Sequence, residues 1–554
     1  MPDDTLEVPV LIVGAGPVGL TMALVLSRFG IRSLIVERHH RISPHPRARF
    51  INARSMEIFR ELGVESAVRA LAVPEELAST VIWAPSLSAP EVRQVVIETL
   101  GSSSGEPFSP SPGVCTSQDL LDPVLVKELA AAGHSEVRFG CSLTGIAEDG
   151  AGVTAECVGQ DGAVTKIRAG YLVGADGPNS TVREVCGIAM QGPAALGHTI
   201  NIHFRADLRA ALRGRPVNLA MILNPAHPGL LLNIDGGQRW TAQAIFQPAA
   251  GQSAEDFDED RCRQVVRAQV GIADLEVSIL GVAPWASAAR VADRLSEGRA
   301  FLVGDAAQEM PPAGGFGMNT GIQEAHNLGW KLAGVVRGWA HSDLLATYDL
   351  ERLPLARWIT EQALLNLRSV GRAENPAGGP PQVKLGRPEF FRELGMVFGA
   401  AYESSAVIPD GSEAPLVENP VTDYVSSARP GCRAPHLWVE VDGKRVSTLD
   451  LAGAGFALVE ATTDNSRAGA LEAVASRTGA PVRAVACADT ALATAYGLAA
   501  GGMVLIRPDG HIGWRAPAGA AGDEITKAVA TILSREGSQG PMSGKPNPQT
   551  SSMS

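Results

Sequence analysis

The hydrophobic and polar positions at the start of the chain predict a strand, a helix and a second strand. Residues 8–13 (VPVLIV) and 33–37 (SLIVE) are short β-branched runs typical of buried strands. Between them, TMALVLSRFG is typical of a helix that ends at Gly30. Two strands joined by a tight turn and a helix make a βαβ unit, whose right-handed crossover predicts a parallel sheet.

The rest of the pattern predicts an α/β protein with further domains. Alternating stretches such as HTINIHF and GLLLNID predict an antiparallel sheet with one covered face, inserted into the first domain. After a Pro/Gly-rich linker, strand-like and helix-like runs predict a small C-terminal α/β unit. The expected boundaries are 1–78, 112–192 and 286–373 for the first domain, 79–111 and 193–285 for the middle domain, 374–425 for the linker and helices, 426–536 for the C-terminal domain and 537–554 for a disordered tail.

Composition limits the possible partners. The net charge of -12 argues against nucleic acid and against an anionic membrane surface. The apolar run from Val10 to Leu26 is interrupted by glycines and a proline, and the N-terminus lacks the basic region of a signal peptide. The seven cysteines are scattered and form no C-x-x-C pair. We therefore expect a cytoplasmic protein with inert thiols and small-molecule partners.

A glycine-rich turn follows the first predicted strand. Gly14, Gly16 and Gly19 form G-A-G-P-V-G, with Pro17 and Val18 between the last two, directly between a strand and a helix. Such a turn brings bare backbone and a helix N-terminus to a diphosphate. Glu37 closes the second strand and is placed to bind a ribose 2′-OH; its charge repels a 2′-phosphate. A plain strand-to-helix turn is the alternative, but this context favours FAD or NAD.

Two later stretches repeat this order of strand, acid and turn. YLVGADGPNSTVR (171–183) carries Asp176 and Gly177, and FLVGDAAQEMPPAGGFGMNTG (301–321) carries Asp305 before a glycine loop. Together with the first turn, they resemble the single-component FAD-dependent aromatic hydroxylases, the group of p-hydroxybenzoate, phenol and aromatic polyketide hydroxylases. The resemblance covers nearly the whole chain and implies a Rossmann-like FAD-binding domain with an inserted substrate domain.

The resemblance also implies roles for the third motif. Asp305 would accept hydrogen bonds from the ribityl hydroxyls of FAD, because an ionised carboxylate offers only acceptors. Thr320 and Gln323 have capping-box spacing, which predicts a helix that begins near Asn319. The backbones of Met318 and Asn319 would then face the flavin, and Gly314, Gly315 and Gly317 would let its edge approach. The carbonyl of Pro312 is the candidate beside the oxygen-reactive carbon, and is the one catalytic group expected.

Other FAD contacts are implied in the same way. Arg47 matches an arginine that reaches the pyrophosphate, and Arg38 is a candidate to pack on adenine; a solvated surface charge is the alternative for each. Gln118 matches a glutamine near the ribityl chain and phosphates, and Leu143 is a candidate backbone contact to adenine. The family usually has G-D-A-A-H, whereas position 308 here is glutamine, which weakens any role for an imidazole there.

Some signals carry less weight. GSSSG (101–105) matches a nucleophile elbow without its strand-to-helix context, and the histidines have no metal-binding spacing. Trp240, Phe246 and Trp285 are candidates to line a substrate cavity, although core packing is the commoner role. The C-terminal unit resembles the thioredoxin-like domain of phenol and polyketide hydroxylases without its two redox thiols, so we expect a structural role.

The resemblance implies a monooxygenase. NADPH or NADH would reduce FAD, molecular oxygen would add to form a flavin hydroperoxide, and one oxygen atom would go to an aromatic, polycyclic phenol or quinone. Baeyer–Villiger oxygen insertion is the main alternative. A flavin halogenase would carry W-x-W-x-I-P, which is absent here, and a redox-relay flavoprotein would need the missing cysteine pair. We expect a monomer or homodimer without a bound metal.

Overall fold

The computed structural model describes residues 5–90, 92–96, 107–369, 373–374, 382–383, 387–462 and 477–535. The stretch GSSSG and the predicted tail lie outside these residues. The chain divides into two compact units: Met1–His326 with Leu353–Arg392, and Asn327–Arg352 with Glu393–Ser554. Two helices, α9 (Phe316–Val336) and α10 (Thr347–Ser369), contribute residues to both units. No helix in the described ranges has the length and apolar character needed to cross a membrane.

The first unit contains an eight-stranded sheet built around the predicted βαβ unit. Strand β1 pairs in parallel with β2 and β10, and β10 pairs in parallel with β19. The main path is β18 (Ser296–Glu297), β19 (Ala300–Leu302), β10 (Val164–Gly174), β1 (Leu6–Val13), β2 (Ser33–Glu37) and β7 (Ser135–Phe139), with β8 (Cys141–Glu148) and β9 (Val153–Gly159) joined through β10. The central strands are buried on both faces, which explains their continuous apolar character.

Helices cover this sheet. Helix α1 (Pro17–Arg28) is apolar nearly all round, because it packs on the sheet and also against α5 (Gln118–Ala132). Smaller elements of the unit are β3 (Phe50–Ile51), α2 (Ala53–Glu61), α3 (Glu65–Arg69), α4 (Glu75–Ala78), β6 (Val114–Cys115), α6 (Thr181–Val185), β11 (Met190–Gln191), α7 (Arg209–Leu212), β17 (Arg290–Ala292), β20 (Gln308–Glu309), β21 (Ala373–Glu374) and β22 (Gln382–Val383).

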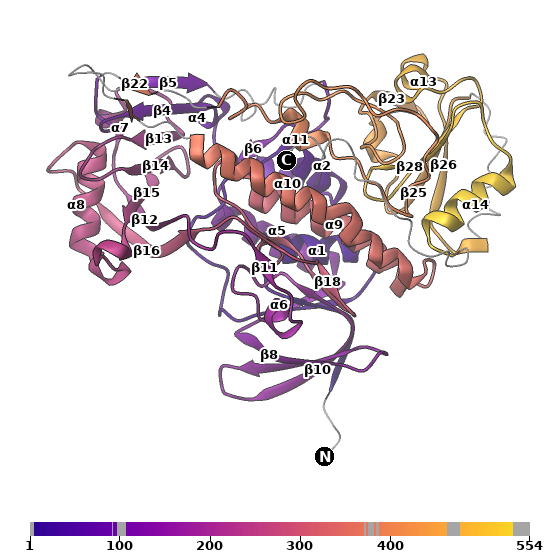
Figure 1. The fold of residues 1–554 in the computed structure, drawn as a ribbon, viewed down its shortest axis with the longest axis horizontal. Helices are drawn as coiled ribbons and strands as arrows, with labels where there is room; N and C mark the ends of the chain where they lie inside the picture. The colour runs from indigo at the N-terminus through magenta and orange to yellow at the C-terminus, as the bar shows by residue number, and fades with distance from the viewer. Residues whose placement is uncertain are drawn as a thin grey trace. The chain divides into compact units, whose positions relative to one another are not determined.

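A second, seven-stranded sheet forms the predicted middle domain. Its order is β16 (Ser278–Ser287), β12 (Gly197–Arg205), β15 (Arg239–Phe246), β14 (Gly229–Asn233), β13 (Leu219–Ile222), β4 (Thr80–Ala84) and β5 (Arg93–Val96). The sheet is antiparallel as predicted, except that β4 pairs with β13 in parallel because β4 arrives from a distant part of the chain. Helix α8 (Glu259–Val270) lies against β15 and β16 and closes one face over a hydrophobic core (Figure 1).

The second unit contains a four-stranded sheet in the order β26 (Val482–Ala486), β25 (Phe456–Glu460), β27 (Met503–Ile506) and β28 (Ile512–Ala516). Strands β25 and β26 are parallel, and β27 and β28 continue the sheet as an antiparallel hairpin, which is a thioredoxin-like arrangement. The unit also contains α11 (Leu394–Phe398), β23 (Trp438–Val441), β24 (Lys444–Ser447), α13 (Thr490–Tyr496) and α14 (Gly522–Ile532). Every cysteine in it is a free thiol.

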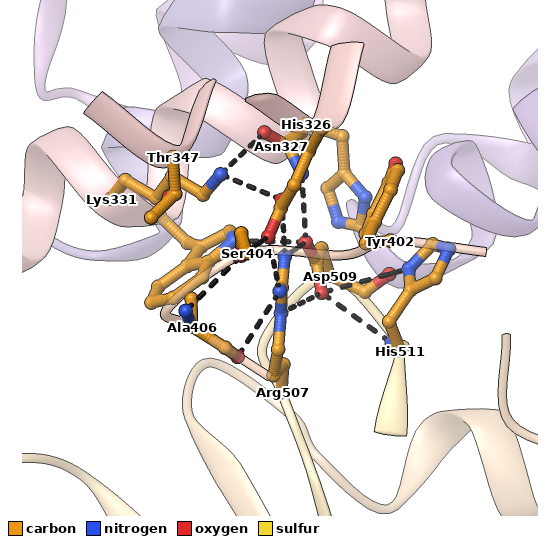
Figure 2. Close-up of polar contacts among 12 residues, drawn as sticks. His326, Asn327, Lys331, Thr347, Tyr402, Ser404, Ala406, Arg507, Asp509 and His511 are labelled. Atoms are coloured by element: carbon orange, nitrogen blue, oxygen red, sulfur yellow. Dashed lines mark hydrogen bonds and ion pairs between the residues drawn. The ribbon is translucent and has the colours of Figure 1, made fainter. Parts of the chain in front are cut away.

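A buried cluster of charges lies inside the second unit (Figure 2). Arg507, from the β27–β28 hairpin, holds Glu351 of α10 through two hydrogen bonds of 2.7 and 2.8 Å. Lys331 of α9 donates to the same carboxylate at 2.7 Å, and Asp509 accepts from Nε and Nη2 of Arg507 at 3.0 and 2.5 Å. The four side chains are almost completely buried, and their formal charges cancel. The cluster therefore joins residues 156 positions apart in the sequence, Glu351 and Arg507.

Candidate functional site

The three sequence motifs follow three neighbouring parallel strands. Strand β1 ends at Val13, β10 at Gly174 and β19 at Leu302, and each motif occupies the turn that comes next. The turns are linked, since Ala175 N–H donates to Val13 O at 2.8 Å and Val303 N–H donates to Gly174 O at 2.9 Å. The motifs thus meet at the carboxyl edge of the sheet, where open α/β sheets bind ligands.

The first turn leaves the start of α1 open. Gly14 has φ +106°, and a Cβ there would lie 2.3 Å from Ala175 O. Gly16 is the N-cap of α1, has no side-chain capping bond, and would place a Cβ in space free of protein. Gly19 packs on the Gly14 carbonyl, while Val18 packs near Gly304. The helix N-terminus, beginning with Pro17, therefore faces an opening that suits an anion.

Glu37 and Asp305 flank this opening. Both oxygens of Glu37 are held by the backbone, Oε2 by Ala15 N–H and Oε1 by His39 N–H, each at 2.9 Å. Asp305 is exposed, and no described residue donates to it. The surrounding protein nevertheless raises the pKa of Asp305 to about 6, with Glu309 adding to the rise and Arg47 opposing it. Asp305 thus keeps its acceptors for a ligand and lies within electrostatic reach of Arg47.

The glycine loop leads into α9 earlier than predicted. The helix begins at Phe316, not near Asn319, so the capping-box interpretation of Thr320 and Gln323 was wrong: both lie inside the helix. Gly317, Met318 and Asn319 form its first turn. Asn319 Oδ1 accepts from Asn52 N–H at 2.9 Å, and its Nδ2 donates to Phe50 O at 2.9 Å. This amide fixes the start of α9 against the segment that follows Arg47.

Pro312 lies in the turn before α9, and its carbonyl accepts from Gly315 N–H at 3.2 Å. Asp176, in the second motif, is held within its own turn, because it accepts from Ser180 Oγ at 2.5 Å and from Val182 N–H at 3.1 Å, while burial raises its pKa. Gly177 has φ +81° and open space beside it. Nearby, Arg183 donates to Ala306 O at 3.2 Å and joins the second motif to the third.

The remaining predicted contacts are spread along the same edge. Arg47 is exposed and forms no ion pair with any described residue, and Arg38 is exposed next to His39. Gln118 begins α5 and donates to Asp122 Oδ2 at 3.1 Å. Leu143 is buried in β8 beside an irregularity of the strand. Gln118 N–H donates to Ala48 O at 2.9 Å, so Arg47 lies in the chain next to the start of α5, and its charge lowers the pKa of both Asp305 and Asp122.

Two buried acids were missed by the sequence analysis. Glu324 of α9 accepts from Gly304 N–H at 2.8 Å and from Gln308 Nε2 at 3.1 Å. It therefore holds the turn that carries Asp305, and it explains the glutamine at position 308, whose amide is a hydrogen-bond donor. The second acid, Asp122, is buried in α5. The sequence alone does not reveal that either acid is buried, because acids within helices usually face solvent.

One face of the middle sheet packs under α8, and the opposite face contacts α5 and His45 of the first domain. Trp240 and Phe246 lie in the core beneath α8, whereas Trp285 has the opposite parity and lies on the other face. That face is apolar around Trp83, Met221 and Leu230 and becomes polar around Asn201, His203 and Gln243. At its polar end, Arg239 pairs with Asp119 of α5, and the His203 ring lies 5.9 Å from that of His45.

These residues fit FAD. The edge offers an open helix N-terminus and Arg47, which forms no ion pair with the residues that the structure describes, and both suit a diphosphate. It also offers Asp305 as an acceptor to which none of the described side chains or backbone groups donates, which suits a polyol chain. The fold and the site therefore define a dinucleotide-binding flavoprotein with a second domain available for another molecule.

Comparison with known proteins identifies the family. Residues 7–363 match the FAD binding domain family, and residues 427–535 match the aromatic-ring hydroxylase C-terminal family. The chain is 37% identical to a tetracenomycin B2 monooxygenase-dioxygenase of Streptomyces olivaceus, over 96% of this chain and 100% of that one.

Two solved structures extend this likeness to three dimensions. The flavin-dependent monooxygenase PieE, in complex with FAD and substrate, is 31% identical, with a TM-score of 0.88 over 96% of this chain and 99% of that one. Aklavinone-11 hydroxylase, in complex with FAD and aklavinone, is 34% identical, with a TM-score of 0.84 over 96% and 100%. This chain belongs to the FAD-dependent aromatic-ring hydroxylases, which are flavoprotein monooxygenases.

Proposed function

We propose that this enzyme hydroxylates a polycyclic phenol or quinone, using molecular oxygen and NADPH or NADH. The names of its relatives support a multi-ring substrate, since they include enzymes of tetracenomycin B2 and aklavinone. The observation that carries the proposal is the graded face of the middle sheet. Its apolar end suits fused rings, and its polar end suits their oxygen substituents.

The proposed FAD contacts follow the carboxyl edge of the first sheet. The opening at Gly16 and Arg47 hold the diphosphate, Glu37 holds the adenosine ribose, and Asp305 holds the ribityl chain. The first turn of α9 directs its N–H groups, including those of Met318 and Asn319, toward the flavin ring. Further contacts are proposed for Gly14, Pro17, Val18, Gly19, Arg38, Gln118, Leu143, Asp176, Gly177, Pro312, Gly315 and Gly317.

Bound FAD supplies the redox chemistry, by carrying electrons from the nicotinamide to oxygen. The protein's own contribution is to orient the substrate and to exclude water. His203 lies on the polar part of the middle sheet, and burial, together with Arg239 and His45, lowers its pKa to about 4. The imidazole is therefore neutral at physiological pH and serves as a hydrogen-bonding group without a positive charge. We assign no protein base, because an acidic phenol can activate its own ring.

The test is product analysis under labelled oxygen gas. The holoenzyme, NAD(P)H and a panel of polycyclic phenols and quinones should give a product with one labelled oxygen on a ring carbon. FAD-free apoprotein is the control and should give none. A labelled oxygen inserted into a ring would instead establish Baeyer–Villiger chemistry. Bound FAD without substrate-stimulated NAD(P)H oxidation across the panel would contradict the proposal.

A further inference from the structure

Asp122 is a buried acid beside the proposed diphosphate site. Its residue is 2% exposed, in the second turn of α5. Oδ2 accepts from Gln118 Nε2 at 3.1 Å, but Oδ1, which is also buried, has no hydrogen-bond partner among the described residues. An ionised carboxylate with one unsatisfied oxygen is costly in such a place, whereas the neutral acid is tolerated.

The charges around Asp122 come from several elements. Arg47 is the nearby cation, and Asp119 and Glu37 are the nearby acids. Asp119 is paired with Arg239, and Glu37 is held by two backbone N–H groups. The other elements packed on α5 carry charges that are paired locally, in the pairs Arg28–Glu61, Arg69–Glu65 and Arg138–Glu136.

The balance of these effects favours the neutral acid. Burial raises the pKa of Asp122 to about 7; Gln118 and Arg47 lower it, and Asp119 and Glu37 raise it further. Arg47 remains exposed and unpaired among the described residues even though Asp122 is close enough to influence it. A cation left without a protein partner, beside an acid that favours its neutral form, is available to an anion from outside the protein.

We propose that Asp122 is a positioning residue for the FAD diphosphate: it stays protonated in the FAD-bound protein, orients Gln118, and leaves the charge of Arg47 to the dinucleotide. This inference rests on the proposed roles of Arg47 and Gln118. Ionisation of Asp122 would place a negative charge near the diphosphate and partly neutralise Arg47. FAD binding is then linked to proton uptake by Asp122, and the affinity falls as the pH rises above the pKa of that residue.

The experiment is an FAD titration of the apoprotein, followed by flavin fluorescence, from about pH 6 to about pH 8.5. For the wild type, Kd should rise by up to about tenfold per pH unit above neutrality. Asp122→Asn, which is always neutral, should remove this rise while keeping an affinity close to that of the wild type at low pH. Asp274→Asn removes an exposed carboxylate in the middle domain and should behave as the wild type does.

Calorimetry in two buffers of different ionisation enthalpy measures the proton uptake directly. Wild-type protein should take up protons on binding FAD at slightly alkaline pH, and Asp122→Asn should take up fewer. An unchanged pH dependence in a folded Asp122→Asn protein would overturn the inference, as would the absence of uptake in the wild type. Either result would leave the cofactor assignment intact, whereas failure of the wild type to bind FAD would overturn the proposed function itself.

Discussion

Gly14 and Gly16 lie in one turn, but a methyl group at each position has a different consequence. Gly14→Ala places a side chain at φ +106° and 2.3 Å from a carbonyl oxygen, so we expect the apoprotein to lose at least about 1–3 kcal/mol of stability. Gly16→Ala meets no protein atom and should cost only the N-cap preference for glycine, at most about 1 kcal/mol, but should weaken FAD binding. Thermal unfolding and FAD titration separate the two effects; equal losses of stability would contradict this.

For single residues, the sequence predicts a location where residue type and spacing from a neighbouring strand are enough to define it. Gly14 directly follows β1, Glu37 is the last residue of β2, and Asp305 lies three residues after the end of β19, so their places at the sheet edge could be predicted. Asp122 and Glu324 could not, because an acid inside a helix has the same local signature whether it is buried or solvated. Trp240 and Trp285 likewise differ only in the face of the sheet on which they lie, which depends on strand register.

Helix α9 connects the turn proposed to face the flavin with the turn that carries Asp305. Glu324 lies two turns into the helix and holds Gly304 N–H and Gln308, so the helix fixes the direction of the acidic turn. Glu324→Ala leaves both donors buried without this acceptor, at a cost of about 1–3 kcal/mol for each. We expect a lower melting temperature together with weaker FAD binding.

Glu324→Gln provides the matched control, because its carbonyl oxygen still serves Gly304 N–H. It should lie between the wild type and Glu324→Ala in both measurements. If Glu324→Ala melts earlier but binds FAD with unchanged affinity once folded, the helix does not determine the position of Asp305.

The beginning of α9 shows why element boundaries were harder to predict than element order. The capping-box spacing of Thr320 and Gln323 is a local signal, but Asn319 is bonded to Asn52 and Phe50. These contacts with a segment more than 260 residues away fix the helix one turn earlier. The order of strands and helices was nonetheless predictable, because hydrophobic periodicity is strong over the length of a βαβ unit.

At the scale of the whole molecule, the buried charge cluster is the feature furthest from sequence prediction. Burial alone would raise the pKa of Glu351, but Arg507 and Lys331 hold it below its usual range. Glu351→Gln removes one negative charge and leaves the two cations with less compensation. We expect a loss of about 3–5 kcal/mol, measured by denaturant unfolding.

Arg483→Gln is the control, because Arg483 forms an exposed ion pair with Asp442, and its melting temperature should match that of the wild type.

The contribution of Glu351 to stability depends on pH, and the sign of this dependence follows from the direction of its pKa shift. A carboxyl whose pKa is lowered by folding contributes stability that is present above its ordinary pKa, near pH 4.5, and lost as the pH falls below it. Acid unfolding should therefore begin at a higher pH in Glu351→Gln than in the wild type, as followed by an unfolding titration.

Because α9 and α10 each belong to both compact units, the flavin half of this enzyme is not a self-sufficient module. A gene truncated before the last domain would encode α9 and α10 with Lys331 and Glu351 but without Arg507 and Asp509. A chimera that exchanges C-terminal domains with a relative would have to bring compatible partners for these two helices. The C-terminal domain and helix α9, whose first turn is proposed to face the flavin, would therefore have to be exchanged together.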